Sequence, residues 1–328
     1  MKVAVITGVA GQDGSYLAEY LLDKDYYVIG LARRNSTSKF FQNINHIDEA
    51  NFLLMEGDLC DPTCISRILV DYSPHEFYNL GAQSHVGYSF SNPVETFRVN
   101  ALSVVMHLNL IKDISPETRY YQAGTSEILG GIDCPKEGYS ENFNSNPRSP
   151  YAVSKTSAYH TVKNFRESFG LYAVTGILFN HSSPRRGHDF ATRKITSSIA
   201  KIKNGTQRKV RMGNLSAFRD EGHSEDYVEA MWMMLNQDYI AGKKEEDYIV
   251  STGAGATIEN MFRHVCNLAE LRFEDVYEVD KRFLRPSDVP YLLGNSSKIK
   301  KDLGWKPKYS WESLLSEMLE KDIEICNK

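Results

Sequence analysis

A glycine-rich loop between a strand pattern and a helical pattern opens the chain and restricts its fold more than any other feature. Val3–Thr7 has the apolar, partly β-branched composition of a buried strand, and the loop Gly8-Val9-Ala10-Gly11-Gln12-Asp13-Gly14 follows it directly. Gly14–Lys24 then repeats apolar side chains at helical spacing. A strand that passes through such a loop into a helix is typical of the first unit of a parallel sheet covered by helices.

The same alternation continues through the first half of the chain. Strand patterns recur at Tyr27–Ala32, Phe52–Glu56, Glu76–Leu80, Arg119–Ala123 and Ala173–Phe179. Helical patterns fill residues 93–112 and 148–168, and after residue 180 they recur at 193–204, 225–236 and 311–326. The sequence therefore predicts an α/β fold with a doubly wound parallel sheet over residues 1–180 and a smaller C-terminal portion over residues 181–328, some of whose segments return to the first.

Composition restricts the partners. The chain carries 38 Lys and Arg against 42 Asp and Glu, so it lacks the basic excess typical of proteins that bind nucleic acid. No apolar run approaches the roughly 20 residues that a membrane-spanning helix needs, so no membrane partner is expected. The five cysteines are scattered, and Cys60 and Cys64 have no second pair nearby to complete a zinc site. We expect free thiols, a cytoplasmic location and no metal.

The glycine loop is a candidate dinucleotide site. In a strand–loop–helix unit, glycines let the backbone approach a pyrophosphate, and the helix N-terminus supplies N–H donors. A tight glycine turn without a ligand would show the same pattern. The residues expected at the cofactor are those of the loop and those that follow the third and fourth strands: Gly8, Gly11, Gln12, Asp13, Gly14, Asp58, Leu59, Leu80, Gly81 and Ala82.

The end of the second strand indicates which nicotinamide cofactor binds. A site selective for NAD usually carries Asp or Glu there, on the ribose 2′-hydroxyl. This chain instead carries Arg33 and Arg34, and guanidinium groups suit a 2′-phosphate. We therefore expect NADP, although a solvated basic loop would also explain the pair.

A second cluster of reactive side chains follows the fifth strand. Tyr151 and Lys155 lie one helical turn apart, so both point the same way and the ammonium is expected to lower the pKa of the phenol. Other Tyr and Lys pairs share this spacing, and only the position after the fifth strand distinguishes this one. That strand leads into Thr125 and Glu127, a hydroxyl and a carboxylate beside the same crevice. Hydride transfer needs no carboxylate, whereas elimination of water does, so Glu127 indicates a dehydratase. A helix-capping carboxylate is the alternative for Glu127.

The chain resembles the extended short-chain dehydrogenase/reductases, and within them the GDP-mannose 4,6-dehydratase family. The similarity covers nearly the whole chain in order. It is carried by the segments TGVAGQDGSYLAE (7–19), YNLGAQSHV (78–86), TSE (125–127), RSPYAVSK (148–155), NFRE (164–167), GILFNHSSPRRG (176–187), TRKI (192–195), RDEGHSEDYVEAMW (219–232), RP (285–286) and LGWKP (303–307).

The resemblance implies a lyase with an internal redox cycle that serves deoxysugar biosynthesis. NADP takes hydride from C4 of a GDP-linked manno-configured sugar while Tyr151, supported by Lys155, removes the hydroxyl proton and Thr125 holds the 4-oxygen. Glu127 removes the C5 proton, water leaves from C6, and the hydride returns to C6. The resemblance also implies a homodimer or homotetramer. It adds Tyr151, Lys155, His181 and Arg186 at the cofactor, and Ser84, Asn180, Lys194, Arg219 and Arg285 at the GDP-sugar, although the last four could be ordinary surface groups.

The chain departs from the usual family residues near the reacting sugar. The family usually carries Ser, Tyr, Glu and Trp where this chain has Gly124, Leu129, Ser182 and Glu221. The first three changes reduce bulk or polarity, so a roomier pocket for a longer sugar, such as a GDP-linked manno-heptose, is one interpretation. Neutral drift is the other.

Two further hypotheses remain open at this point. A nucleotide-sugar epimerase or 4-reductase would share the fold, but neither reaction needs a carboxylate at position 127. A regulator that binds the cofactor without chemistry would not need Thr125, Glu127, Tyr151 and Lys155 together. A 4,6-dehydratase of GDP-mannose, or of the equivalent GDP-heptose, is the leading hypothesis.

Overall fold

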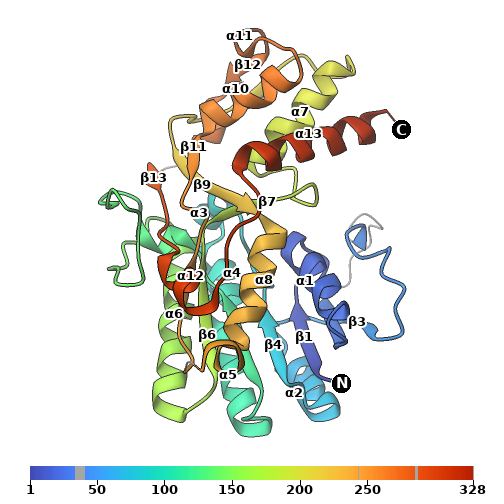
Figure 1. The fold of residues 1–328 in the computed structure, drawn as a ribbon, viewed down its shortest axis with the longest axis vertical. Helices are drawn as coiled ribbons and strands as arrows, with labels where there is room; N and C mark the ends of the chain where they lie inside the picture. Colours follow the sequence, from blue (N-terminus) through green and yellow to red (C-terminus); the bar gives the residue numbers. More distant parts are fainter. Residues whose placement is uncertain (34–40, 243, 285–286, 328) are drawn as a thin grey trace.

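A parallel sheet forms the centre of the molecule. The computed structural model describes residues 1–33, 41–242, 244–284 and 287–327 (Figure 1). Seven strands pair in the order β10-β6-β5-β4-β1-β2-β3, and every pair is parallel. Their bounds are β1 Val3–Thr7, β2 Tyr27–Ala32, β3 Phe52–Glu56, β4 Glu76–Asn79, β5 Arg119–Ala123, β6 Ala173–Leu178 and β10 Tyr248–Val250. The predicted strands are confirmed, with β4 and β6 ending one residue earlier than the pattern indicated.

Helices cover both faces of this sheet, as the alternation predicted. Side chains of a strand alternate between faces, so Ala4 and Ile6 of β1 pack toward α1 and α8, whereas Val5 packs toward α2, α5 and α6. These helices span Gln12–Leu22 (α1), Pro62–Tyr72 (α2), Ser103–Ile114 (α5), Pro150–Phe169 (α6) and Ser224–Leu235 (α8). The doubly wound α/β fold is therefore confirmed.

The predicted helical stretch 93–112 is three consecutive elements. Pro93–Phe97 (α4) passes into a π-helical turn at Arg98–Leu102 (η2) before α5 begins. A short helix, α3 (Val86–Ser91), precedes them. None of the helices in the described part of the chain is long and apolar enough to cross a membrane.

The C-terminal portion has its own core, in the upper part of Figure 1. Apolar side chains of α7 (Ala191–Lys203), α10 (Ile258–Leu268) and α13 (Trp311–Cys326) pack together there. Four short strands lie between this core and the main sheet: β7 Asn180–Ser182, β9 Phe218–His223, β11 Gly255–Thr257 and β13 Tyr291–Leu292. The smaller elements are η3 Ser126–Leu129, β8 Val210–Met212, α9 Gln237–Ala241, α11 Phe273–Val276, β12 Tyr277–Val279, η4 Lys281–Phe283 and α12 Ser297–Leu303.

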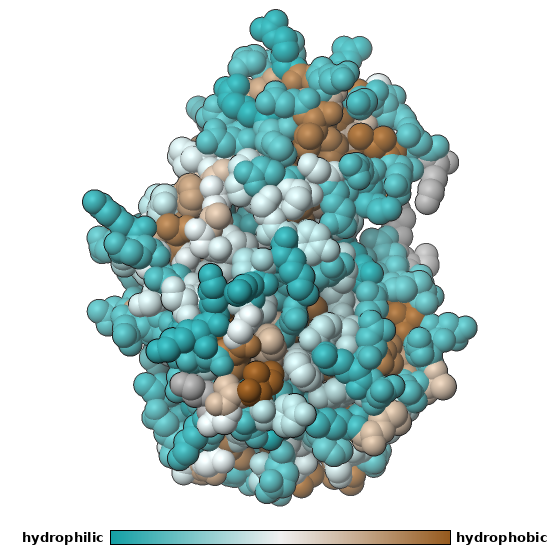
Figure 2. All heavy atoms as spheres, viewed as in Figure 1, coloured by the Kyte–Doolittle hydropathy of each residue, from teal (hydrophilic) through white to brown (hydrophobic). Residues whose placement is uncertain are grey.

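After residue 180 the chain passes between the C-terminal portion and the main sheet more than once. After β9 the chain returns as α8, which packs beside α1 on the main sheet, and β10 then pairs with β6 (Figure 1). The face seen in Figure 2 is covered mainly by hydrophilic side chains, with small separate hydrophobic patches. The large apolar side chains are therefore mostly enclosed by the two layers of helices and by the C-terminal core.

Candidate active site

The glycine loop turns tightly between β1 and α1. Gly8 has a φ of +72°, which favours glycine, and its amide donates to the Leu31 carbonyl at 3.0 Å. A Cβ at Gly14 would lie 2.4 Å from the Gly8 oxygen, so no larger residue fits there without moving the backbone. Gly11 precedes α1 and offers no side chain to cap it, which leaves the N–H groups of the first turn available to an anion. This is a cradle for a phosphate.

Gln12 and Asp13 connect this loop to β7. The Gln12 Oε1 accepts from the Ser183 hydroxyl at 3.0 Å, and the Asp13 carboxylate lies 2.8 Å from the His181 Nε2. Burial alone would raise the pKa of Asp13, but His181 and Arg186 outweigh burial and bring that pKa to about 2. Both side chains therefore join the first helix to the C-terminal portion.

The loops after β3 and β4 adjoin the glycine loop. The Gly81 amide donates to the Thr7 hydroxyl at 3.0 Å, and a Cβ at Gly8 would lie 2.8 Å from the Gly81 Cα. Asp58 accepts from the Cys60 amide at 2.8 Å, and the Leu59 carbonyl accepts from His107 at 2.7 Å. Leu80, Gly81 and Ala82 are half-buried, and Ser84 is exposed. The structure thus brings together, at the carboxyl ends of the strands, the predicted cofactor residues that follow β1, β3 and β4.

Tyr151, Lys155, Thr125 and Glu127 are all buried at the neighbouring end of β5. The helix α6 begins at Pro150, and the Ser149 hydroxyl caps it by accepting from the Ala152 amide at 3.1 Å. This cap fixes Tyr151 in the first turn. The Lys155 Nζ donates to the Ala123 carbonyl at 2.9 Å. The Thr125 hydroxyl accepts from the Glu127 amide at 3.2 Å, which fixes the turn that carries the carboxylate.

The electrostatics of the tyrosine differ from the prediction. Burial, together with Glu127, raises the pKa of Tyr151 to about 12, although the Thr125 hydroxyl and the Arg186 guanidinium act in the opposite direction. The predicted lowering of this pKa by Lys155 is wrong for this structure, because the ammonium is directed at the Ala123 carbonyl. Burial also lowers the pKa of Lys155, to about 8. The site therefore holds a phenol, a carboxylate and an easily deprotonated amine together.

The residues predicted on the substrate side surround β7 and β9. Asn180 lies on β7, and Arg219 lies on β9, where its Nη1 donates to the Phe218 carbonyl at 2.8 Å. Lys194 lies in α7 with its ammonium 3.2 Å from the centre of the Phe283 ring. Arg186 donates to the His181 carbonyl at 3.1 Å and covers the Phe190 ring. Of these cationic groups, Arg186 acts on the pKa of both Tyr151 and Asp13, so it lies beside the tyrosine and the glycine loop.

Two arginines of the expected site lie outside the described residues. These are Arg34 and Arg285. Arg33 is described, directly after β2, and it is exposed.

Sequence reasoning missed Arg185. Its guanidinium lies 2.8 Å from Glu19, donates to the Ser15 hydroxyl at 3.0 Å and covers the Tyr16 ring, so it joins α1 to the segment after β7. The only signal was its position inside the SSPRRG segment, where Arg186 drew the attention.

The three positions that suggested a roomier sugar pocket all contact other parts of the protein. A Cβ at Gly124 would lie 2.7 Å from the Gly176 carbonyl oxygen, so the missing side chain faces β6. Leu129 packs in an apolar cluster with Ile177 and Phe179. The Ser182 side chain faces the carboxylate of Glu221, whose Oε1 accepts from the Ser182 hydroxyl at 2.5 Å. These contacts account for the three residues without a longer sugar, and a substrate such as a GDP-linked manno-heptose stays a prediction.

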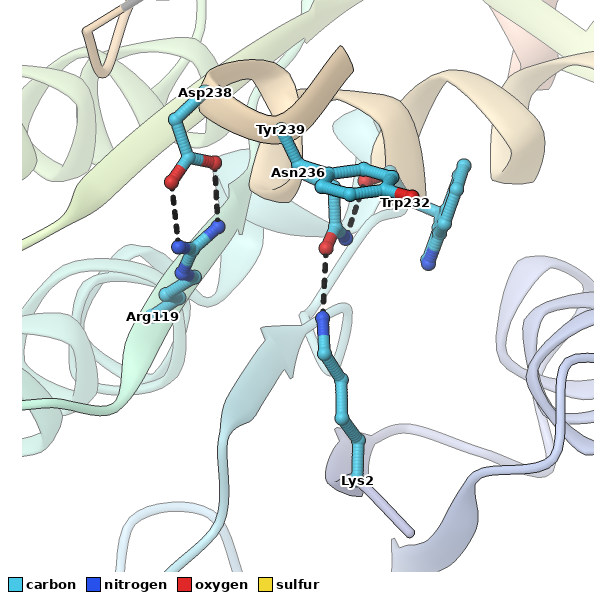
Figure 3. Close-up of a pocket in the computed structure, with 6 residues that line it drawn as sticks. All are labelled: Lys2, Arg119, Trp232, Asn236, Asp238 and Tyr239. Carbon is cyan, nitrogen blue, oxygen red and sulfur yellow. Dashed lines mark hydrogen bonds and ion pairs between the residues drawn. The ribbon is translucent and has the colours of Figure 1, made fainter. Parts of the chain in front are cut away.

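A cavity of about 500 Å³ lies at the opposite end of the sheet (Figure 3). Lys2 donates to the Asn236 side chain at 2.9 Å there, and Arg119 forms a two-point ion pair with Asp238. Lys2 precedes β1 and Arg119 begins β5, so the cavity faces the amino ends of the strands. Ligands of doubly wound sheets bind at the carboxyl ends. This cavity is therefore separate from the candidate active site.

Comparison with known proteins agrees with this geometry. The sheet order, the glycine loop and the Tyr–Lys pair on α6 define an extended short-chain dehydrogenase/reductase. The profile of the family described as GDP-mannose 4,6 dehydratase matches residues 5–318. GDP-mannose 4,6 dehydratase 1 of Arabidopsis thaliana is 44% identical, over 100% of this chain and 91% of that relative. GDP-mannose 4,6-dehydratase of Vibrio cholerae is 41% identical, over 100% of this chain and 95% of the relative. The chain belongs to the GDP-mannose 4,6-dehydratase family.

Solved structures share the fold at lower identity. The dTDP-glucose 4,6-dehydratase of Bacillus anthracis, in complex with NAD, superposes with a TM-score of 0.84 at 21% identity, over 98% of this chain and 96% of that one. The UDP-glucose 4-epimerase of Thermotoga maritima, with UDP-glucose, gives 0.85 at 23% identity, over 98% and 99%. A dehydratase and an epimerase superpose equally well, so the fold alone does not select the reaction.

Proposed function

We propose that this chain is an NADP-dependent 4,6-dehydratase that converts GDP-mannose to GDP-4-keto-6-deoxymannose. The observation that carries the proposal is the buried carboxylate of Glu127 beside Tyr151, where it acts on the pKa of the phenol. An epimerase or a 4-reductase needs the phenol and the amine but no acid–base group for elimination. Membership of the family supports the same reaction.

The residues present fit a nicotinamide dinucleotide. The glycine cradle at the start of α1 suits the pyrophosphate, with Leu80, Gly81 and Ala82 along the cofactor and Tyr151 and Lys155 at the ribose. His181 and Arg186 complete this side of the site. When bound, the nicotinamide would accept hydride from C4 of the sugar and return it to C6.

The side chains divide the proton transfers between them. Tyr151 accepts the proton of the 4-hydroxyl, and Thr125 donates a hydrogen bond to the same oxygen. Lys155, which donates to the Ala123 carbonyl, is proposed to hold the nicotinamide ribose. Once C4 is a ketone, the C5 proton is acidic, and Glu127 removes it and delivers a proton to the departing 6-hydroxyl. Water leaves, and the proton that Tyr151 took from the 4-hydroxyl would return to C5 of the sugar, which balances the proton transfers.

The choice of NADP over NAD rests on the arginines after β2. Arg33 is exposed directly after the strand and is free to meet a 2′-phosphate, and Arg34 follows it in the sequence. Release of the bound nucleotide by denaturation, followed by mass spectrometry, tests this choice. NADP in the released fraction is the expected result, and NAD alone would contradict it.

GDP-mannose is the proposed substrate rather than a GDP-heptose, because contacts within the protein account for Gly124, Leu129 and Ser182 without a longer sugar. Its nucleotide and diphosphate would meet Ser84, Asn180, Lys194, Arg219 and Arg285. Four apolar side chains of α4–α6 also support a homodimer or homotetramer, because they are 42–82% exposed: Val94, Leu102, Val105 and Val153. Light scattering tests that assembly. We place the enzyme in the cytoplasm.

The experiment follows the mass of the sugar nucleotide. Purified protein, without added cofactor, is incubated with GDP-mannose and separately with GDP-manno-heptose. Loss of one water from GDP-mannose, with no net NADPH formed, is the expected result. Loss of water from GDP-manno-heptose alone would show that the heptose is the substrate instead. If the mass of neither sugar nucleotide changes, even after NADP is added back, the epimerase or reductase is favoured.

Glu127→Gln isolates the elimination step. We expect kcat to fall by about 10²–10⁴-fold, because the acid–base group is lost. Oxidation at C4 needs only the remaining groups, so NADPH absorbance is expected to rise and persist. Glu137→Gln, at an exposed carboxylate of the following loop, is the control. Full turnover in Glu127→Gln would contradict the proposed function.

A further inference from the structure

A chain of hydrogen bonds runs from β9 through β7 to α7. The Thr192 hydroxyl lies 2.8 Å from the Ser182 hydroxyl, and the Ser182 hydroxyl in turn donates to the Glu221 carboxylate at 2.5 Å. All three side chains are buried. Because the carboxylate only accepts, Ser182 donates to Glu221, and Thr192 donates to Ser182. The carboxylate therefore fixes the direction of the whole chain.

This chain supports the beginning of α7. Phe190 precedes α7 and provides no hydrogen bond from its side chain to cap it. Thr192 lies in the first turn, and Lys194 follows two residues later. The bond from Thr192 to Ser182 connects this uncapped first turn to β7. Without the acceptor at Glu221, the two hydroxyls would lose the group that orients them.

Glu221 also adjoins the other residues proposed to hold the GDP-sugar. In the β7–β9 ladder Asn180 is paired with Glu221, so the two side chains share one face of the ribbon. Arg219 lies two residues earlier on that face. Arg186 and Arg219 act against the rise that burial causes in the pKa of Glu221, which shows that both guanidinium groups lie within electrostatic reach. The Glu221 carboxylate therefore offsets part of the positive charge of Arg186 and Arg219, the two arginines proposed to bind phosphates.

Two departures from the usual family residues meet in this contact. The family usually carries Glu at position 182 and Trp at position 221, whereas this chain has Ser182 and Glu221. Each change looks isolated in the sequence, but in the structure the two side chains hydrogen-bond to each other.

We propose that Glu221 is a positioning residue for the GDP-sugar, which acts through Ser182 and Thr192 to fix the start of α7 and with it Lys194. Ser182 and Glu221 are then one exchanged pair that works only as a pair. The proposal rests on the function proposed above for this cleft.

The first experiment separates the hydrogen bond from mere packing. Glu221→Gln keeps an acceptor for Ser182, whereas Glu221→Ala removes it. We expect Glu221→Ala to raise KM for GDP-mannose by about tenfold with kcat within about threefold, and Glu221→Gln to stay within about threefold in both. A structural role alone would lower the melting temperature without separating KM from kcat. Equal KM values in the Ala variant and the wild type would overturn the proposal.

The second experiment restores the usual family residues one at a time and together. Ser182→Glu buries two carboxylates side by side, and Glu221→Trp leaves Ser182 without its acceptor, so each single variant is expected to raise KM. The double variant is expected to return KM to within about threefold of the wild type. The exchange would be contradicted if the increase in KM of the double variant equalled the product of the increases in the two single variants.

Two controls keep the outcomes distinct. Ser310→Ala removes the capping box of α13, so it lowers the melting temperature and leaves KM unchanged. Binding of GDP alone is measured by calorimetry in every variant. If the wild type binds GDP but does not dehydrate GDP-mannose, the proposed function fails, and the GDP affinities still decide about Glu221: weakened binding in Glu221→Ala but not in Glu221→Gln supports it, and equal binding overturns it.

Discussion

The two sides of the cleft are built in different ways. On the cofactor side, Gly8 and Thr125 follow β1 and β5, two strands of five residues in one continuous parallel sheet, and Tyr151 lies in the first turn of α6. On the substrate side, Asn180 and Arg219 lie on a ribbon in which β7 has three residues and β13 has two. That ribbon gathers segments from residues 180–182, 218–223, 255–257 and 291–292.

The difference separates the reaction from the choice of substrate. The sheet holds the groups proposed to transfer protons by regular backbone pairing, which leaves little freedom for local change. The ribbon holds the groups proposed for the GDP-sugar by side-chain contacts such as Ser182–Glu221, which two substitutions can rearrange. We therefore expect single changes on the cofactor side to abolish function, and paired changes on the substrate side to be tolerated.

The largest expected effect is on the cofactor side. In Gly14→Ala, the new Cβ would lie 2.4 Å from the Gly8 oxygen, so the glycine loop must open and the phosphate cradle is lost. Purified Gly14→Ala should contain no bound dinucleotide and show no turnover. Gly205→Ala is the control, because an added Cβ there meets open space, and the strain of alanine at the φ of +79° lies outside the glycine loop. A Gly14→Ala protein that retained its full content of bound nucleotide would contradict the expectation that single changes on the cofactor side abolish function.

A buried ion pair tests how the substrate side is held. Arg193 of α7 and Asp322 of α13 lie 2.8 Å apart, with side chains that are 4% and 3% exposed. Asp322→Ala leaves a buried guanidinium without its carboxylate, and we expect the free energy of unfolding to fall by about 3–5 kcal/mol. Urea unfolding measures this loss. Lys321→Ala, at an exposed pair on the same helix, should leave the unfolding curve unchanged.

The buried amine on the cofactor side predicts a pH dependence of stability. The pKa of Lys155 falls from 10.5 to about 8 on folding. Between these values the unfolded chain keeps a proton that the folded chain has released, so the free energy of unfolding rises with pH there, by at most about 3 kcal/mol. Below pH 8 the full cost of burying the charge is present. Lys155→Met should lack this rise when both proteins are unfolded with urea at pH 7.5 and pH 10.

The smallest effect is expected far from the cleft, at the cavity of Figure 3. Arg119 and Asp238 form a two-point ion pair there, but the aspartate side chain is 41% exposed. Asp238→Asn should lower the free energy of unfolding by less than about 1 kcal/mol, and by less again at high salt. Turnover should not change. A loss of activity would show that this end of the sheet is coupled to the site.

The sequence predicted the cofactor side better than the substrate side for a physical reason. Continuous apolar runs such as Tyr27–Ala32, separated by helical patterns, can be recognised without knowing their neighbours. Strands of two or three residues, such as Tyr291–Leu292, carry none and exist only because β9 pairs with them. The bond between Ser182 and Glu221 spans 39 positions, so each residue looked like an isolated departure. The pKa of Tyr151 depends on burial, which spacing along a helix does not reveal.

The return of the chain to the main sheet has a consequence for its modularity. Strand β10 pairs with β6 at the sheet edge, and α8 covers apolar side chains of the same layer as α1. A fragment that ended at residue 180 would expose the unpaired edge of β6 and an uncovered apolar face, which are the features that promote aggregation. The two portions are thus not separable modules. Recombination that exchanges one substrate portion for another must carry β10 and α8 with it, or redesign the sheet that receives them.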